Sequence, residues 1–342
     1  MNILTVGDKA RARWDSVAKP LHSLGTLEDY IVQIAGIQQT ADVRLDRRCA
    51  LVFCGDHGVV EEGVSQSGSE VTALVAKSIA EGTGNINLMA DAANTDVFAA
   101  DMGMLVPVPG TLDLRVGAGT ANMTRGPAMT REQAEQAVQR GIDLIGRMKE
   151  KGYQIAVIGE MGIGNTTASS AIASVLLGLP AEAVTGRGAG LSDAGLIRKT
   201  AAITRAIELN QPDPSDPMDV LAKLGGFELA GMTGAYLGGY LHHLPTVTDG
   251  MIPNVCALLA ARLCPAAASS ILPGHVSREP ADRKILDALG MKPVIDAGMA
   301  LGEGTGGVLL LPLLDMALRV YHGTHTFEGL GMKAYTPQGP LP

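Results

Sequence analysis

Two glutamates, each flanked by glycine-containing turns, are the residues of this sequence best suited to proton transfer. Glu303 stands in LGEGTGG, ahead of the apolar run 308–314, and Glu160 stands in GEMG after a short apolar stretch. A carboxylate beside a buried segment needs hydrogen-bond donors or a catalytic task, because leaving it unpaired there costs free energy. Partial burial also raises a carboxyl pKa toward the range in which a general base works. Glu303 is therefore either the cap of the helix that follows it or a base.

A glycine loop that follows Glu160 has the composition of an anion site. The stretch GEMGIGNTTASSAI, residues 159–172, follows a predicted strand and opens a predicted helix. Gly162 and Gly164 let a ligand approach the backbone, and the free N–H groups and dipole at a helix N-terminus favour phosphate. Three polar side chains at the start of that helix either bind such an anion or simply cap the helix: Asn165, Thr166 and Thr167.

A second glycine loop precedes a helix that carries two cations. TGRGAGLSDAGLIRKT, residues 185–200, ends in Arg198 and Lys199. Lys199 could complete a phosphate site begun by the first loop, whereas the bland interpretation is that both cations are solvated helix residues.

Asp56 and His57 stand at the end of another predicted strand, before a Ser-rich acidic loop. Such a combination suggests a hydrolase, but the sequence has no G-x-S-x-G elbow to expose a serine. It also suggests a metal site with His275, but no spacing of the HExxH kind supports one. Both interpretations are weak.

The elements that must position these residues alternate between strand and helix. Apolar runs that end in turn residues predict strands at 50–55, 96–103, 154–162, 244–250 and 268–274. Helical periodicity predicts helices at 131–151, 166–177, 193–209 and 227–242. This alternation predicts an α/β fold with a doubly wound, mostly parallel, Rossmann-like sheet. Because ligands bind outside the carboxyl ends of such strands, we expect one composite site there.

The two ends of the chain lack a strong strand signal. We expect residues 1–45 and about 280–342 to form a small helical domain, and residues 46–279 to form the large α/β domain. A net charge of −8, 3% aromatic residues and the lack of any Lys/Arg run argue against binding to nucleic acid. Four cysteines without CxxC spacing are typical of the reducing cytoplasm. The apolar runs are shorter than the roughly 20 residues of a membrane span.

Six motifs together resemble one family, the nicotinate-nucleotide:dimethylbenzimidazole phosphoribosyltransferases of cobamide lower-ligand assembly. The resemblance covers about residues 20 to 330 and implies a dimer, a homodimer or a heterodimer of two similar chains, that needs no metal or redox cofactor. The motifs are GDHGV (55–59), GEMGIGNTT (159–167), GGFELAGMTGAYLG (225–238), DGMI (249–252), HVSREP (275–280) and LGEGTGGVLLLPLLD (301–315).

The resemblance also implies roles for the residues. Phosphoribose would pass from nicotinate mononucleotide to a small aromatic base, in a single displacement that inverts the anomeric carbon to the α form. Glu303 matches the family's catalytic glutamate and would take the N–H proton of the incoming base. Glu160 would stabilise the positive charge that develops on the ribose. The 5′-phosphate site maps onto Gly162 to Thr167, with Lys199 as its cation.

The acceptor base is the part of the reaction that the resemblance leaves open. Its expected pocket contains Asp56, His57, Ser65, Ser69 and Leu301. Family members usually carry a proline in the loop after GVS, and this chain has GVSQSGSEVT instead. A phenolic acceptor, with the chain as one subunit of a heterodimer, is therefore the alternative to dimethylbenzimidazole. A nucleotide hydrolase and a non-catalytic nucleotide-binding subunit are the alternatives from other classes.

Overall fold

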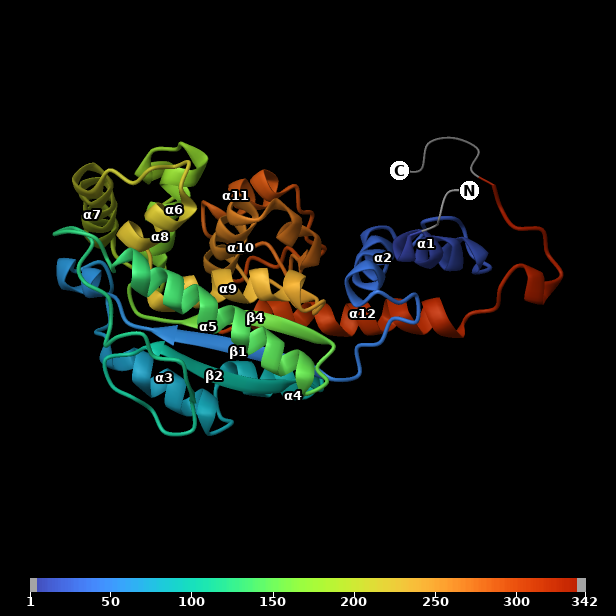
Figure 1. Ribbon diagram of the computed structural model, residues 1–342. Coiled ribbons are helices and arrows are strands. Elements are labelled where there is room, and N and C mark those ends of the chain that lie inside the picture. The colour runs from blue at the N-terminus through green and yellow to red at the C-terminus, as the bar shows by residue number, and fades with distance from the viewer. Residues whose placement is uncertain (1–4, 337–342) are drawn as a thin grey trace.

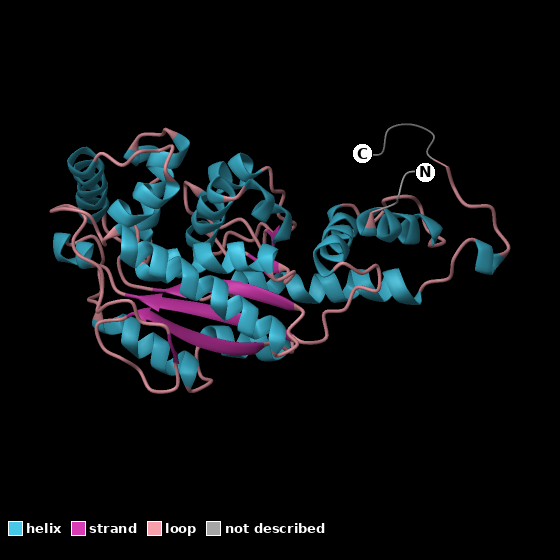
Figure 2. Ribbon diagram, in the orientation of Figure 1, coloured by secondary structure: helices cyan, strands magenta, loops and turns pink. Residues whose placement is uncertain are grey.

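A six-stranded, all-parallel sheet forms the centre of the computed structural model, which describes residues 5–336 (Figures 1 and 2). The strand order is β3-β2-β1-β4-β5-β6, so the order reverses between β1 and β4. The predicted parallel α/β sheet is confirmed. The strands are β1 (Arg48–Gly55), β2 (Asp96–Gly103), β3 (Leu112–Asp113), β4 (Ile155–Met161), β5 (Thr246–Val247) and β6 (Ile271–Leu272).

Helices cover both faces of the sheet, and the alternation of side chains along β1 shows which face is which. Cys49, Leu51 and Phe53 join a core cluster with α5 (Arg131–Glu150) and α9 (Phe227–Leu241). The side chains between them, Ala50, Val52 and Cys54, join a second cluster with α3 (Glu70–Ala80), α4 (Asn85–Ala92) and α12 (Thr305–Gly323). All eight residues of β1 are buried, as expected for a central strand of a parallel sheet.

The four helices predicted from periodicity are confirmed, each within one residue of its expected ends. Further helices frame the sheet. Within residues 5–336, no helix combines the length and hydropathy that crossing a bilayer requires. The helices not yet given are α1 (Val6–Ser16), α2 (Thr26–Gln38), α6 (Asn165–Leu177), α7 (Asp193–Asn210), α8 (Pro217–Leu224), α10 (Met251–Leu263) and α11 (Asp282–Leu289).

A small group of helices, made of α1, α2 and the C-terminal part of α12, projects from the sheet (Figure 1). The Trp14 and Tyr321 rings meet there edge to face, with centroids 5.0 Å apart. The Tyr321 hydroxyl also donates to the Ala41 carbonyl at 2.9 Å. Helix α11 packs against α10 instead, and α12 begins beside β4 and ends in the small group. The division into two domains at 45 and 280 stays a prediction.

Candidate active site

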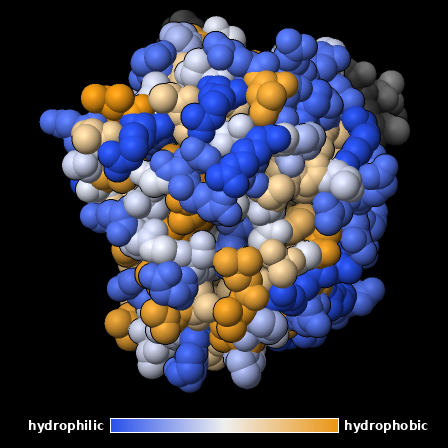
Figure 3. Space-filling view, turned by 90° about the vertical axis from the view of Figure 1, so that its left-hand side faces the viewer, coloured by the Kyte–Doolittle hydropathy of each residue, from blue (hydrophilic) through white to orange (hydrophobic). Residues whose placement is uncertain are grey.

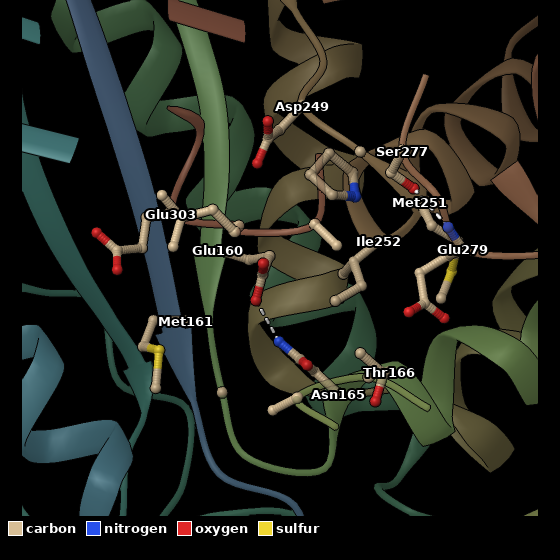
Figure 4. A pocket seen from close by; sticks show the side chains of 18 of the residues that line it. Glu160, Met161, Asn165, Thr166, Asp249, Met251, Ile252, Ser277, Glu279 and Glu303 are labelled. Carbon is tan, nitrogen blue, oxygen red and sulfur yellow. Dashed lines mark hydrogen bonds between the residues drawn. The ribbon is translucent and has the colours of Figure 1, made fainter. Parts of the chain in front are cut away.

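A cavity of about 290 Å³ lies at the carboxyl ends of the central strands, on the side of β4 and β5 (Figure 4). It is lined by the end of β4, the start of α6, the loop after β5 and the turn before α12. A smaller cavity of about 60 Å³ shares the start of α6 with it. No Lys or Arg of the described chain lines the larger cavity, whereas four carboxyl groups do: Glu160, Asp249, Glu279 and Glu303.

Glu303 occupies a left-handed turn that directs its side chain toward α4. Its φ is 61°, between φ values of 83° and 93° at Gly302 and Gly304. One carboxylate oxygen accepts from Asn85 Nδ2 at 3.0 Å, and the other accepts from the Ile86 N–H at 3.1 Å. Glu303 therefore caps α4, and the interpretation of it as the cap of its own helix is wrong.

Asp249 caps α12 in its place. Its two carboxylate oxygens accept from the N–H groups of Gly304, at 3.0 Å, and Gly306, at 2.7 Å. Burial is the main reason that the pKa of Asp249 rises to about 7, and these backbone donors oppose the rise. The side chain thus holds the Glu303 turn against the loop that follows β5.

Glu160 points into the cavity from the end of β4, and Asn165 Nδ2 donates a hydrogen bond to it (Figure 4). Burial raises its pKa to about 8, and the nearby charge of Asp249 adds to the rise. In the ligand-free protein the side chain is therefore mostly neutral at pH 7. Gly302 has a φ of 83°, which favours glycine, and a Cβ there would lie 2.8 Å from Glu160 Oε1.

His275 also lines the cavity, although its sequence signal was only a weak suggestion of a metal ligand. Its Nε2 lies 3.6 Å from Asp249 Oδ1, and neither ring nitrogen has a hydrogen-bond partner among the described residues. Burial lowers its pKa, which favours the neutral ring at pH 7. In residues 5–336 no three His, Cys, Asp or Glu side chains are grouped so as to hold a metal ion.

The predicted phosphate loop borders both cavities at the N-terminus of α6. Gly162, Asn165 and Thr166 line both cavities, and Gly164 lines the smaller one. Within the described chain, the N–H groups of Gly164 and Thr166 have no acceptor, so both are available to an anion. Thr167 lines neither cavity, because its side chain is turned into the protein and fully buried.

Lys199 lies behind this loop and is fully buried. Its Nζ donates to Thr166 Oγ1 at 2.8 Å and to the Gly186 carbonyl at 3.1 Å. Burial lowers its pKa to about 8, and the charge of Glu279 opposes that shift. The solvated alternative holds for Arg198, which is exposed, and not for Lys199.

The residues expected around the acceptor base are dispersed. Leu301 lines the larger cavity and Ser65 the smaller one, whereas Ser69 directly precedes α3 and lines neither. Asp56 and His57 are buried away from both cavities. Asp56 accepts from the Leu105 N–H at 2.7 Å. Besides His275, the lining residues that the sequence did not single out include Met161, Ser67, Asp249, Ser277 and Glu279.

The strand order, the glycine loop at a helix N-terminus and the acidic cavity are typical of an α/β protein that binds nucleotides, and comparison with known proteins gives the class of enzyme. Residues 4–331 match the family model described as Phosphoribosyltransferase. The chain therefore belongs to the phosphoribosyltransferases, and its relatives narrow the family to the nicotinate-nucleotide–dimethylbenzimidazole phosphoribosyltransferases.

Relatives with that name match over almost their full length. The protein from Ruminiclostridium cellulolyticum is 41% identical over 98% of this chain and 96% of its own. The protein from Desulforudis audaxviator is 44% identical over 94% of this chain and 92% of its own. The crystal structure of CobT from Thermus thermophilus superposes with a TM-score of 0.90 at 42% identity, covering 96% of this chain and 99% of that one.

Proposed function

We propose that this protein transfers phosphoribose from nicotinate mononucleotide to 5,6-dimethylbenzimidazole, giving α-ribazole 5′-phosphate and nicotinate for cobamide assembly. The observation that carries the proposal is Glu303, a carboxylate fixed on a glycine turn at the wall of an acidic cavity beside a helix N-terminus. The names of the relatives support dimethylbenzimidazole as acceptor and do not favour the phenolic alternative.

The charges of the site fit the two ends of this nucleotide. The phosphate would lie against the α6 N-terminus, where the Gly164 and Thr166 N–H groups are free and Lys199 holds the Thr166 hydroxyl. The pyridinium and the ribose would lie among the carboxyl groups of the larger cavity, which favour a cationic ring and the positive charge that develops at the anomeric carbon.

One base is enough for this reaction. The leaving pyridinium departs as a neutral ring nitrogen, so it needs no acid. The incoming benzimidazole attacks the anomeric carbon through one nitrogen and loses the proton on the other, and Glu303 would accept that proton. Its present donors, Asn85 Nδ2 and the Ile86 N–H, would have to yield as the acceptor binds.

Glu160 would act as the second carboxyl group of the reaction. A pKa of about 8 leaves it mostly neutral in the empty site. A pyridinium cation in the cavity favours the ionised form, so binding of the nucleotide would lower that pKa and prepare a carboxylate facing the ribose.

The experiment that tests the proposal measures nicotinate release from nicotinate mononucleotide with and without 5,6-dimethylbenzimidazole. Release should depend on the acceptor, and the product should be α-ribazole 5′-phosphate. Competition among benzimidazoles, purines and phenols then ranks the acceptors by product identity. Substantial nicotinate release without any acceptor would instead identify a hydrolase.

We also infer that the active form is a homodimer. The support is a set of exposed apolar side chains, with Leu74 61% exposed, Leu88 69% and Val106 60%. Figure 3 shows apolar side chains on the lower half of the end toward which the strands point, below a mostly hydrophilic upper half. Light scattering of the protein expressed alone should give twice 35.4 kDa together with activity. Activity only after addition of a second, similar chain would support the heterodimer.

A further inference from the structure

A buried pair of ionisable side chains lies beneath the glycine loop and takes no part in the reaction described above. His57 follows β1, Glu228 lies in the first turn of α9, and His57 Nε2 hydrogen-bonds with Glu228 Oε1. The two side chains are 2% and 0% exposed. Burying such a pair carries a large desolvation penalty, so net stability is a poor explanation for its presence.

The front of the pair supports the loop directly. A Cβ at Gly164 would lie 3.0 Å from the Cβ of His57, and one at Gly162 would lie 3.2 Å from Glu228 Oε1. The closest neighbours of the two added Cβ atoms are the Gly55 carbonyl oxygen, 2.4 Å from that at Gly162, and Val60 Cγ2, 2.9 Å from that at Gly164. The loop backbone is therefore packed against these two side chains together with the end of β1 and the turn after it, with no room for a side chain at either glycine.

The back of the pair is closed just as tightly. A Cβ at Gly55 would lie 2.5 Å from Glu228 Oε2, and one at Gly226 would lie 2.3 Å from His57 Cε1. Glu228 Oε2 is buried and has no hydrogen-bond partner among the described residues. β1 and α9 both belong to the core, so their positions are fixed. The pair joins these two elements and packs against the loop.

We propose that His57 and Glu228 are positioning residues for nucleotide binding. The pair fixes the position of the Gly162–Thr166 backbone relative to β1 and α9, and so places the free N–H groups of Gly164 and Thr166 against the 5′-phosphate. This inference rests on the proposed function. It gives His57 a role in holding the nucleotide phosphate, in place of the contact with the acceptor base that the sequence suggested. Anion-binding donors must be held within about 0.5 Å of their working positions, which a rigid support beneath the loop provides.

The test uses three variants that disturb the pair in different ways. Glu228→Gln and His57→Gln change one partner each. Gly226→Ala keeps both partners but places a methyl group against His57 Cε1 and Glu228 Oε2, at a residue whose φ of −144° alanine adopts readily. Steady-state kinetics are measured with nicotinate mononucleotide and with nicotinate riboside, which lacks the phosphate, and the KM for dimethylbenzimidazole is measured alongside.

We expect the KM for nicotinate mononucleotide to rise about 10-fold or more, since a shift of about 1 Å in a positioning group can cost up to 10²-fold. The KM for dimethylbenzimidazole should stay within about 2-fold of its wild-type value, because the proposal leaves the position of the acceptor unchanged. The preference for nucleotide over riboside should fall, which a general loss of packing would not cause. Thr233→Val is the matched control, because Thr233 is buried on the same helix and its hydrogen bonds go to the Leu229 carbonyl and to Cys256, not to His57 or Glu228.

Two results would overturn the proposal. One is a folded Glu228→Gln protein with wild-type nucleotide KM and undiminished preference for the phosphate. The other is a raised KM for dimethylbenzimidazole with an unchanged nucleotide KM, which would return His57 to the acceptor site. Glu228→Gln is nearly isosteric and decides the matter if His57→Gln does not fold. Calorimetric binding of nicotinate mononucleotide gives a readout that stands even if the wild-type protein proves not to be a transferase.

Discussion

At the scale of single residues, the charge of Glu303 is what the proposed reaction depends on most. Glu303→Gln should lower kcat at least about 100-fold, because the amide cannot accept the acceptor's proton. Its remaining carbonyl oxygen can still accept from Asn85 or Ile86, so the protein should fold and bind nicotinate mononucleotide normally. Turnover assays with calorimetric binding check this. Wild-type kcat in a folded variant would assign the proton transfer to another group.

Glu160 predicts a pH dependence of stability. Its pKa is raised from an ordinary value of 4.5 to about 8 by burial, so its contribution is fully present below about pH 4.5 and is lost as the pH rises through 8. Glu160→Gln should remove a slope of up to about 1.4 kcal/mol per pH unit in that window. Denaturant titrations of both proteins without substrate, from pH 5 to 8.5, measure the difference. Parallel curves for the two proteins would show that Glu160 ionises normally.

Only part of the residue-scale geometry could be predicted from the sequence. The glycine context of Glu303 and Glu160 indicated their importance, but Asn85 is 218 positions from Glu303 and Glu228 is 171 positions from His57. Local patterns carry no information on such pairs. The same holds for Asp249, which gave no signal beyond its motif. The N–H groups that donate to its carboxylate lie at the start of a helix that begins 56 residues later.

At the scale of secondary structure, the start of α12 depends on one side chain from another element. Asp249→Ala removes the acceptor for the Gly304 and Gly306 N–H groups, and losing such a cap costs about 1–2 kcal/mol. Because the same turn carries Glu303, kcat should fall as well. Asp249→Asn keeps one oxygen acceptor, so its stability and its kcat should both fall less than those of Asp249→Ala. Denaturation and turnover of the two variants give the comparison, and equal loss in both would argue against capping as the cause.

Five of the six strands could be predicted from their apolar runs. The two short ones among them, β5 and β6, lie within the predicted runs 244–250 and 268–274 but are shorter than those runs, and β3 could not be predicted. β1, β2 and β4 run through the core for seven or eight residues each and leave long apolar runs in the sequence. β3, β5 and β6 contain two residues each, and β3, whose residues are exposed or half-buried, left no signal. The formation and the ends of a strand this short depend on pairing with a neighbouring strand, and a local sequence pattern does not encode that pairing.

At the scale of the whole molecule, α12 links the cavity to the small helical group. Trp14→Ala should cost about 3–5 kcal/mol locally, because the ring is fully buried against Tyr321. Hydrogen exchange should show lost protection in α1, α2 and the C-terminal part of α12, while β1 and β4 keep theirs. Uniform loss across the protein would instead show that the two parts unfold as one unit. The activity of this variant measures how strongly the position of the Glu303 turn depends on the packing of the C-terminal end of α12.

The four carboxyl groups of the cavity also bear on the release of nicotinate. Within nicotinate mononucleotide the nicotinate ring is a zwitterion, with its pyridinium balancing its own carboxylate. Once the glycosidic bond breaks, the ring nitrogen is neutral and the same molecule becomes an anion. In the proposed binding mode this anion is enclosed by Glu160, Asp249, Glu279 and Glu303. Like charges in a confined space of low dielectric repel each other strongly. We therefore expect nicotinate to bind this site more weakly than the nucleotide does, most of all once Glu160 is ionised, so the lining favours release of this product without changing the equilibrium of the transfer.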